Sequence, residues 1–488
     1  MNQDIKNSEP TEVWSHFADL NAVPRPSKKE EKIIQFMVDF GKKQQLETIV
    51  DAVGNVIIKK PASHGMEDKK TVVLQGHLDM VHQKNATTEF NFEEQGINMF
   101  VEGDWVKAKG TTLGADNGLG VAAIMAILSS KTIIHPTIEA LFTIDEETGM
   151  TGAMNLNANT LAGDILLNLD TEEDDEIGIG CAGGLDVTAT RIYEEEEIPE
   201  NTNSFSISIT GLTGGHSGMD IHKGLGNANK IMNRLLFDGF TNFGLRISAI
   251  NGGSLRNAIP RESFAKVVVN SSSKAFFLSE TNTLINQIKQ EFSTIEPHLS
   301  IQIEEISQPK SVIDLGVQEG FLRAMYAALN GVYKMSPDVE GLVETSNNIA
   351  KVDLKNGKIL VGCLTRSSSE SSKLDLANSI RAAFELAGFE VEFSGAYPGW
   401  LPNMNSEILQ IVSNTYCKLF EKEPKIMACH AGLECGILGQ NYPKMDMISF
   451  GPNIKGAHSP DERAQISSTQ KFWKLLQEVL KNIPEKKI

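Results

Sequence analysis

Residues 71–80, TVVLQGHLDM, form the stretch of sequence that decides the fold. The apolar run over residues 71–74 is typical of a buried strand. Residues two apart on a strand share a face, so His77 and Asp79 leave the sheet side by side at the carboxyl end of this strand. Open α/β sheets place their ligand crevices at that edge. The pair therefore predicts a functional site at the carboxyl edge of a sheet.

Further acidic residues follow predicted strands and turns in the same way. Asp116 lies in a Gly-rich turn, KGTTLGADNGLG. Glu146 and Glu147 end the run ALFTIDEETG, and Asp170 ends the run DILLNLD. Much later in the chain, His458 stands in KGAHSPDER. A single strand-end acid is ordinary, but this set combines imidazole with carboxylate, and that combination suits zinc and also manganese or cobalt.

The set is large enough to hold two metal ions. Such a pair, about 3.5–4 Å apart, needs a bridging carboxylate and one or two terminal ligands for each metal. Five groups are available for this: His77, Asp116, Glu147, Asp170 and His458. With Asp116 as the bridge, His77 and Asp170 would complete one site, and Glu147 and His458 would complete the other. The alternative is a set of unrelated surface acids, with His77 an ordinary buried histidine.

Asp79 and Glu146 remain as carboxylates beside the metals. A water held between two zinc ions has a pKa near 7, so hydroxide is available at neutral pH. Glu146 directly precedes a ligand, so it can accept the proton of that water and pass it to a leaving amine. Asp79 can fix the orientation of metal-bound His77. The alternative for Glu146 is an acid that is simply solvated in a turn.

Composition limits the kinds of partner. The 488 residues suggest about two to three domains, and the net charge of −18 argues against nucleic acid and anionic membranes. The chain has five cysteines, and an odd and small number in a chain of this length does not suggest a disulfide framework. The N-terminus has no apolar core of a signal peptide, and the run VAAIMAIL is too short to cross a membrane. These features predict a cytoplasmic protein with reduced thiols.

The order of predicted elements indicates an α/β fold. A mostly parallel sheet with helices on both faces is expected, because helical and strand patterns alternate from about residue 11 to 184. The helices are expected at 13–20, 29–43 and 118–130, and the strands at 46–59, at 71–80 and before Asp145 and Asp170.

The pattern changes after the acidic stretch YEEEEIPE and returns near residue 396. Antiparallel strands and amphipathic helices over residues 185–395 predict an α+β lid domain, with possible sub-blocks 185–307 and 308–395. Residues 1–184 and 396–488 would then form one discontinuous dizinc catalytic domain, because His458 must return to the other ligands. The length of the insert leaves open whether the chain works as a monomer or a homodimer.

Several motifs together resemble one family over nearly the whole chain. The runs GHLDMV, GTTLGADNGLGVA, DEETGMTGA, NLDTEE and GAHSPDE resemble the aminoacyl-histidine dipeptidases. These are the peptidase D branch of the dizinc peptidases that include carnosinases, carboxypeptidase G and peptidase T. The resemblance implies a cytosolic metallo-dipeptidase that cleaves Xaa-His peptides such as carnosine, with the ligand roles given above and a cis bond between Asp116 and Asn117. Zinc is the implied metal, and cobalt or manganese stays open.

The resemblance also implies roles for four residues of the insert and the C-terminal segment. His216, in GLTGGHSGMDIHKGLGNA, would reach the reacting carbonyl, and Asn257, in GGSLRNAIP, would lie near the substrate. Arg366, in LTRSSSES, would meet the substrate carboxylate through its bidentate geometry. Gly432, in ACHAGLECG, would offer backbone N–H groups to that carboxylate. The alternatives are a histidine with local bonds only and an ordinary strand-end arginine.

Two matters stay open at this point. The segment ACHAGLECG departs from the glycine-rich form of related carboxypeptidases, so its Cys429, His430, Glu434 and Cys435 could form a third metal site or a redox pair. Glu434 could instead meet the amine or imidazole of the substrate.

The metal motifs encode hydrolysis and not side-chain preference, so a broad dipeptidase, a tripeptidase or an amidohydrolase is the rival function. A non-catalytic binding protein is disfavoured, because none of the seven site residues is lost.

Overall fold

The computed structural model describes residues 2–486, and the chain divides into two compact units. The first unit consists of Met1–Gly180, Pro402–Ala428 and Leu433–Ile488, and the second consists of Cys181–Leu401 and Cys429–Gly432. The sequence predicted boundaries at 184/185 and 395/396. The short piece Cys429–Gly432, which was assigned to the catalytic domain, belongs to the second unit.

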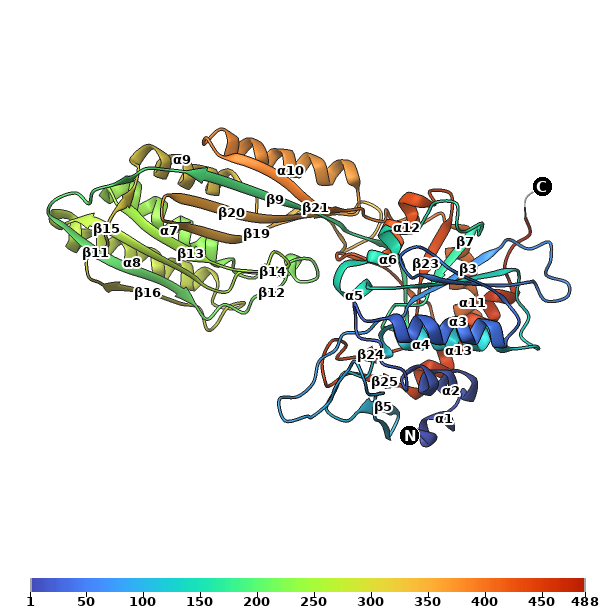
Figure 1. The fold of residues 1–488 in the computed structure, drawn as a ribbon. Helices are drawn as coiled ribbons and strands as arrows, with labels where there is room; N and C mark the ends of the chain where they lie inside the picture. The colour runs from blue at the N-terminus through green and yellow to red at the C-terminus, as the bar shows by residue number, and fades with distance from the viewer. Residues whose placement is uncertain (1, 487–488) are drawn as a thin grey trace. The chain divides into compact units, whose positions relative to one another are not determined.

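An eight-stranded sheet forms the centre of the first unit (Figure 1). Its four central strands are parallel, and antiparallel strands flank them on both sides. The α/β class is therefore confirmed, with the parallel part confined to the middle of the sheet. In spatial order the strands are β1 (Glu47–Val50), β2 (Val56–Lys60), β6 (Ile138–Thr143), β3 (Val72–His77), β7 (Ile165–Asn168), β23 (Asp446–Ser449), β8 (Glu176–Cys181) and β22 (Lys425–Cys429).

The prediction of a single strand over residues 46–59 is wrong, because the chain forms a hairpin there. β1 and β2 pair antiparallel. One oxygen of the Asp51 side chain accepts the backbone N–H groups of Val53, Gly54 and Asn55 at 3.0, 2.9 and 2.9 Å. Gly54 adopts a φ of 111°, which favours glycine. The apolar residues of both strands continued one pattern and hid this turn.

Helices cover the sheet of the first unit. Every residue of β3, β6 and β7 is buried, so both faces of these strands are covered. α4 packs against both α2 and β3, α3 packs against β1 and β2, and α11 packs against β23 and α13. The main helices are α2 (Thr11–Leu20), α3 (Glu31–Lys43), α4 (Ala115–Ser129), α11 (Glu407–Phe420) and α13 (Ile466–Lys481), and the short ones are α1 (Gln3–Lys6), α5 (Glu146–Gly149), α6 (Thr151–Met154) and α12 (Glu434–Asn441).

A small four-stranded sheet completes the first unit. Its order is β24 (Ile454–Lys455), β25 (Arg463–Gln465), β5 (Trp105–Ala108) and β4 (Met99–Glu102). The connection from β24 to β25 contains His458. Pairing of β25 with β5 therefore brings the C-terminal segment next to the segment that leads into α4.

The second unit is built on an antiparallel sheet. Strands from both predicted sub-blocks interleave in it, since β9 lies between β20 and β21, and one hydrophobic core joins them. In order, the strands are β16 (Ser300–Glu305), β11 (Thr202–Thr210), β15 (Ser263–Asn270), β13 (Arg246–Gly252), β19 (Val343–Lys355), β20 (Lys358–Ser367), β9 (Gly183–Ile192) and β21 (Glu390–Tyr397), and β18 (Gly331–Met335) pairs with β19.

Helices pack on this sheet and leave part of it exposed. Burial alternates along β11 and β15, as expected for strands with one covered face. The helices are α7 (Ala228–Phe243), α8 (Lys274–Glu291), α9 (Leu315–Ala327) and α10 (Glu370–Glu385). The short elements are β10 (Glu195–Glu196), β12 (Gly215–His216), β14 (Ala258–Ile259), β17 (Val312–Ile313), η1 (Ile221–Lys223) and η2 (Ser271–Ser273).

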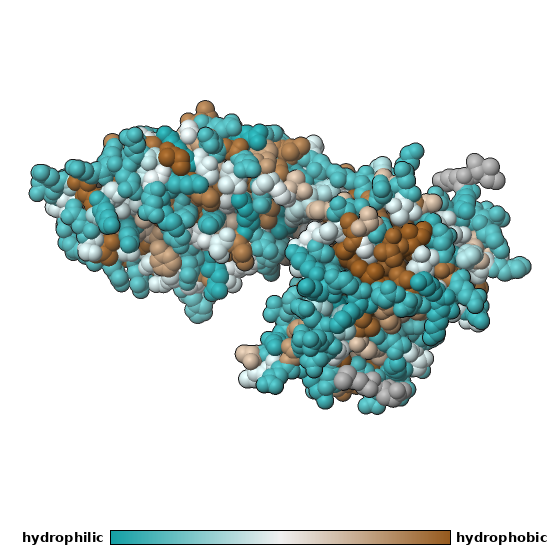
Figure 2. Space-filling model, in the orientation of Figure 1, coloured by the Kyte–Doolittle hydropathy of each residue, from teal (hydrophilic) through white to brown (hydrophobic). Residues whose placement is uncertain are grey.

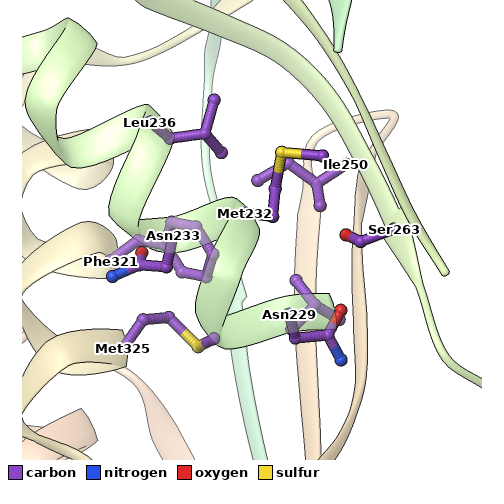
Figure 3. A pocket seen from close by; sticks show the side chains of 9 residues that line it. Asn229, Met232, Asn233, Leu236, Ile250, Ser263, Phe321 and Met325 are labelled. Atoms are coloured by element: carbon purple, nitrogen blue, oxygen red, sulfur yellow. The ribbon is translucent and has the colours of Figure 1, made fainter. Parts of the chain in front are cut away.

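A small cavity lies between α7, α9 and the sheet of the second unit (Figure 3). Asn229, Asn233, Ser263 and Phe321 are among the residues that line it. Its volume of about 10 Å³ is too small for any peptide, so it is not a candidate substrate site.

The surface and the helix lengths agree with the composition. The visible face of each unit is mostly hydrophilic, with one larger apolar area on the first unit (Figure 2). Across residues 2–486, no helix combines the length and the apolar character that a membrane span requires.

Candidate metal centre

The side chain of Asp116 lies between two imidazoles. Its Oδ1 is 3.1 Å from Nε2 of His77, and its Oδ2 is 3.2 Å from Nε2 of His458. The two histidines are 381 positions apart in the sequence, yet each faces a different oxygen of one carboxylate. This is the arrangement expected of a carboxylate that bridges two cations.

Two ligand groups share this carboxylate. His77, Asp116 and Asp170 converge in one group, and Asp116, Glu147 and His458 converge in the other, with ligand atoms within 4.8 Å of one another in each. Nε2 of His77 is 3.5 Å from Asp170 Oδ1, and Nε2 of His458 is 3.1 Å from Glu147 Oε2. The structure thus brings together all five predicted ligands in the two sets that the sequence predicted.

The residues fit divalent metal ions. Within the part of the chain that the structure describes, the buried oxygens Asp170 Oδ1 and Glu147 Oε1 have no hydrogen-bond partner. Buried carboxylate oxygens without partners are costly unless a cation is bound. The donor set of two imidazoles and three carboxylates suits zinc, cobalt or manganese.

The fold explains why these side chains meet. His77 ends β3, Glu147 lies in α5 just after β6, and Asp170 follows β7. β3 pairs in parallel with both β6 and β7, so these chain segments emerge at one edge of the sheet. Asp116 lies at the start of α4, and the bond to Asn117 is cis, as the resemblance implied.

Asp79 connects one ligand to the segment of Glu146 and Glu147. Its Oδ1 lies 3.3 Å from Nδ1 of His77 and accepts the backbone N–H of Glu146 at 3.0 Å. Its Oδ2 accepts the N–H of Glu147 at 3.3 Å and the hydroxyl of Ser27 at 2.7 Å. Asp79 is fully buried, so it holds these groups without being exposed to solvent itself.

The carboxylate of Glu146 is held beside the ligands with both oxygens uncommitted. Among residues 2–486 no donor contacts it, whereas its backbone N–H binds Asp79. Burial raises the pKa of Glu146 well above its usual value, and Asp170 and Glu434 raise it further, although His77 opposes them. A raised pKa means that this carboxyl holds a proton more tightly than an exposed glutamate does.

The pKa of each histidine is raised, although burial opposes the increase in both. Burial lowers the pKa of His77, but Asp170 and Asp116 outweigh it and hold the pKa well above 6.5. Hydrogen bonds to Asp116 and Glu147 raise the pKa of His458 to about 11. A raised pKa favours the protonated imidazole, and a metal ion that binds there would have to displace that proton.

Residues outside the predicted set support the site. Arg25 and Glu462 bind the backbone around Asp116. Glu434 is 2% exposed, and its Oε2 accepts hydrogen bonds from Gln75 at 2.6 Å and Thr143 at 2.7 Å. Burial raises the pKa of Glu434 to about 7. Glu434 and Glu462 each lie in a motif quoted above, ACHAGLECG and GAHSPDE, whereas Arg25 lies in none.

The four predicted substrate residues all belong to the second unit. Nδ1 of His216 accepts the backbone N–H groups of Gly218 and Met219 at 3.2 and 3.0 Å, so in the neutral ring Nε2 carries the proton and can donate. Asn257 is exposed, and its carbonyl accepts the N–H of Ser217 at 2.8 Å. His216 and the residue after Asn257 pair in β12 and β14.

Arg366 and Gly432 lie in the same part of the second unit. Arg366 is 4% exposed, donates to the Tyr397 hydroxyl at 2.7 Å, and leaves its Nε without a partner among the described residues. Gly432 lies two residues after His430, whose carbonyl oxygen would lie 2.0 Å from a Cβ at Gly218. Burial lowers the pKa of His430 to about 3, and Arg366 and His216 lower it too.

The predicted alternative of a third metal site is not supported. Across the described residues, the groups able to hold a metal do not include Cys429, His430, Glu434 or Cys435. Nε2 of His430 instead contacts the Ser346 hydroxyl at 2.8 Å. No disulfide joins the cysteines of the described chain.

Comparison with known proteins gives consistent matches. The profile described as Peptidase family M20/M25/M40 matches residues 73–482. The cytosol non-specific dipeptidase of Escherichia coli (strain K12) is 42% identical over 483 residues, which cover 99% of this chain and 100% of that protein. The crystal structure of aminoacylhistidine dipeptidase from Vibrio alginolyticus superposes with a TM-score of 0.94 at 45% identity over 99% of both chains. Aminopeptidase PepT from Bacillus cereus shares the fold, with a TM-score of 0.57 at 14% identity over 98% of this chain and 99% of that one.

Proposed function

The chain belongs to peptidase family M20/M25/M40 and is thus a hydrolase acting on peptide bonds, and from this we propose that it is a two-metal dipeptidase that prefers Xaa-His substrates. The observation that carries the proposal is the Asp116 carboxylate, with one oxygen 3.1 Å from His77 and the other 3.2 Å from His458. Zinc is the proposed metal, with cobalt or manganese as alternatives, and a cytoplasmic location is proposed because the E. coli relative is a cytosol dipeptidase.

The proposed mechanism assigns one task to each group. His77 and Asp170 would hold one metal, Glu147 and His458 would hold the other, and Asp116 would contribute to both sites. Two bound divalent ions would acidify a water molecule and polarise the substrate carbonyl. Glu146 takes a proton from the attacking water and delivers it to the nitrogen of the leaving amine as the peptide C–N bond breaks.

Asp79 completes the mechanism without touching the substrate. Its carboxylate faces Nδ1 of His77, so Nε2 of that ring is the nitrogen left for the metal. The same carboxylate binds the N–H of Glu146 and so keeps the general base in place. Asp79 is therefore assigned to orientation of both a ligand and the base.

The second unit supplies the proposed substrate contacts. Arg366 is buried, and a nitrogen of its guanidinium has no partner among the described residues, as expected of a group that awaits an anion. We assign it to the carboxylate of the dipeptide, with Gly432 offering a backbone N–H and Asn257 a further polar contact. His216 would donate from Nε2 to the developing oxyanion.

A broad dipeptidase is the second candidate. It is favoured by the name of the E. coli relative, a non-specific dipeptidase, whereas the Vibrio relative is an aminoacylhistidine dipeptidase. A tripeptidase or an amidohydrolase of the same family is a more distant alternative.

Two measurements test the proposal. Metal analysis of the purified chain should find about two divalent ions per chain under the two-metal scheme. Hydrolysis of β-alanyl-histidine, alanyl-histidine and matched dipeptides without histidine should then show higher kcat/KM for the histidine peptides. Equal values across the panel would replace the Xaa-His assignment with the broad dipeptidase, and a metal-free active enzyme would refute the mechanism.

A further inference from the structure

Two buried ionic side chains outside the ligand set hold the turn that carries Asp116. Glu462 is 3% exposed and Arg25 is 1% exposed, and both belong to the first unit. Neither has a task in the mechanism above. Most of their hydrogen bonds go to backbone groups at or near the metal ligands, and Nη2 of Arg25 also donates to Oδ1 of Asn21 at 2.9 Å.

Glu462 accepts four successive backbone N–H groups. Its Oε2 accepts those of Leu113 at 2.7 Å and Gly114 at 2.9 Å, and its Oε1 accepts those of Ala115 at 2.7 Å and Asp116 at 3.3 Å. These groups lie at the start of α4, where a helix offers no carbonyl partners. An ionised carboxylate there makes charge-assisted bonds and is favoured by the helix dipole. Glu462 thus fixes the backbone from which the Asp116 side chain projects.

Arg25 binds a backbone carbonyl of the same turn, whereas Glu462 binds its N–H groups. Its Nη2 donates to the carbonyl of Gly114 at 2.5 Å, and its Nη1 donates to the carbonyls of Leu78 at 3.1 Å and Asp79 at 3.0 Å. One guanidinium therefore ties the segment after β3 to the turn before α4. A Cβ at Gly114 would lie 2.6 Å from Nη2, so the backbone approaches the guanidinium as closely as glycine allows.

Glu462 also belongs to the turn that presents His458. The N–H of Ser459 donates to the carbonyl of Gly456 at 3.2 Å, and the N–H of Glu462 donates to that of Ser459 at 3.0 Å. His458 itself has a φ of 63°, a conformation that only its surroundings can hold in a non-glycine residue. One side chain thus connects the segment of His458 to the segment of Asp116.

We propose that Glu462 and Arg25 are positioning residues that hold the Asp116 carboxylate in register with both imidazoles. Glu462 fixes Asp116 relative to His458, and Arg25 fixes it relative to the end of β3 that carries His77. A carboxylate shared by two cations tolerates little displacement, so metal affinity depends on both clamps. The inference rests on the proposed function and names residues that prepare its site.

The test is the substitution Glu462→Gln with zinc titration of the metal-stripped, full-length chain. Glutamine keeps the shape, but its NH2 group cannot accept, so two of the four N–H groups lose their partner. Loss of such outer contacts typically costs 10–100-fold in metal affinity, and we expect about that loss here. The visible spectrum of the cobalt(II)-loaded variant should also change, because the geometry around the metals changes.

Glu139→Gln is the matched control. Glu139 is 3% exposed, and its Oε2 accepts the backbone N–H groups of Ala162 at 2.8 Å and Gly163 at 3.0 Å. It lies at the start of β6, at the opposite end of that strand from Glu146 and Glu147. This variant should lower the melting temperature like Glu462→Gln while keeping wild-type zinc affinity and the wild-type cobalt spectrum.

The outcomes separate the inference from the proposed function. Wild-type zinc affinity in Glu462→Gln, or an equal loss of zinc in Glu139→Gln, would overturn the positioning role. If Glu462→Gln does not fold, Arg25→Lys takes its place, because lysine keeps the charge but cannot span both sets of carbonyls. Zinc binding by that variant at wild-type strength would also refute the inference. A wild-type chain that binds no zinc, cobalt or manganese would instead overturn the proposed function itself.

Discussion

Glu146 and Glu147 are adjacent in the sequence, but a change to glutamine should affect turnover at the first and metal binding at the second. Oε2 of Glu147 lies 3.1 Å from Nε2 of His458, in the group that also contains Asp116. Glu146 lies in a different group, with His77 and Glu147, so the geometry alone would allow it to be either a ligand or a base. Changing each glutamate to glutamine keeps the size and removes the charge and the proton affinity, and so distinguishes the two roles.

For Glu146→Gln we expect a loss confined to turnover. Removing a general base typically lowers the rate by 10²–10⁴, or about 3–5 kcal/mol of barrier, while zinc content and KM stay near wild type. The metal-free variant should be no less stable than the wild type. Burial and the nearby charges of Asp170 and Glu434 raise the pKa of Glu146, so a neutral amide is less costly there than a carboxylate.

For Glu147→Gln we expect the loss to appear first in metal binding. The buried Oε1 of Glu147 has no partner among residues 2–486, and its Oε2 faces His458, so the substitution removes a ligand charge where a cation is needed. Zinc content after dialysis against buffered zinc should fall below that of the wild type, and added zinc should restore part of the activity. Turnover of β-alanyl-histidine at saturating zinc completes the comparison. Zinc loss in Glu146→Gln, or wild-type turnover by it, would refute the assignment of the base.

Three further predictions concern single side chains. Arg366→Ala should raise KM for dipeptides by about 10–100-fold, the value of a charge-assisted contact, and equal losses on dipeptide amides would argue against carboxylate binding. His216→Ala should lower kcat by about 10²–10³ with zinc binding intact, and an unchanged kcat would remove it from the oxyanion site. Burial raises the pKa of Glu434 from 4.5 to about 7, so the stability that its neutral form contributes is full below pH 4.5 and lost as pH rises through about 7. Metal-free Glu434→Gln should therefore melt above the wild type at pH 8 and closer to it at pH 5, and identical melting curves at pH 8 would contradict that sign.

The ligands could be predicted because their signal is local. His77 and Asp170 each stand at the carboxyl end of an apolar run, and parallel pairing of β3 with β7 gathers such ends at one edge. The residue types then indicate the kind of site, since imidazole and carboxylate together are typical metal ligands. His458 was included for its residue type although it lies far along the chain, and its motif GAHSPDE also resembled that of a known family.

The misplaced elements lacked such a signal. Residues 46–59 form one apolar pattern across two strands, and only the side-chain bonds of Asp51 to the backbone mark the turn. The transfer of Cys429–Gly432 to the second unit depends on tertiary bonds, such as the N–H of Ala182 donating to the carbonyls of Cys429 and Ala431, each at 3.0 Å. Hydrophobic periodicity reports burial of side chains and is silent about where backbone groups find their partners.

The same limit explains why the positioning roles of Arg25 and Glu462 were not predicted, although Glu462 lies in the motif GAHSPDE. Each is almost fully buried, although charged residues are mostly exposed, so composition and periodicity assign both to the surface. What keeps them buried is the backbone: Glu462 receives four N–H groups and Arg25 donates to three carbonyls, all next to metal ligands. A ligand can be recognised from its own chemistry, but a residue that positions a ligand is defined by the peptide groups it binds. Such residues become visible only once the chain is folded.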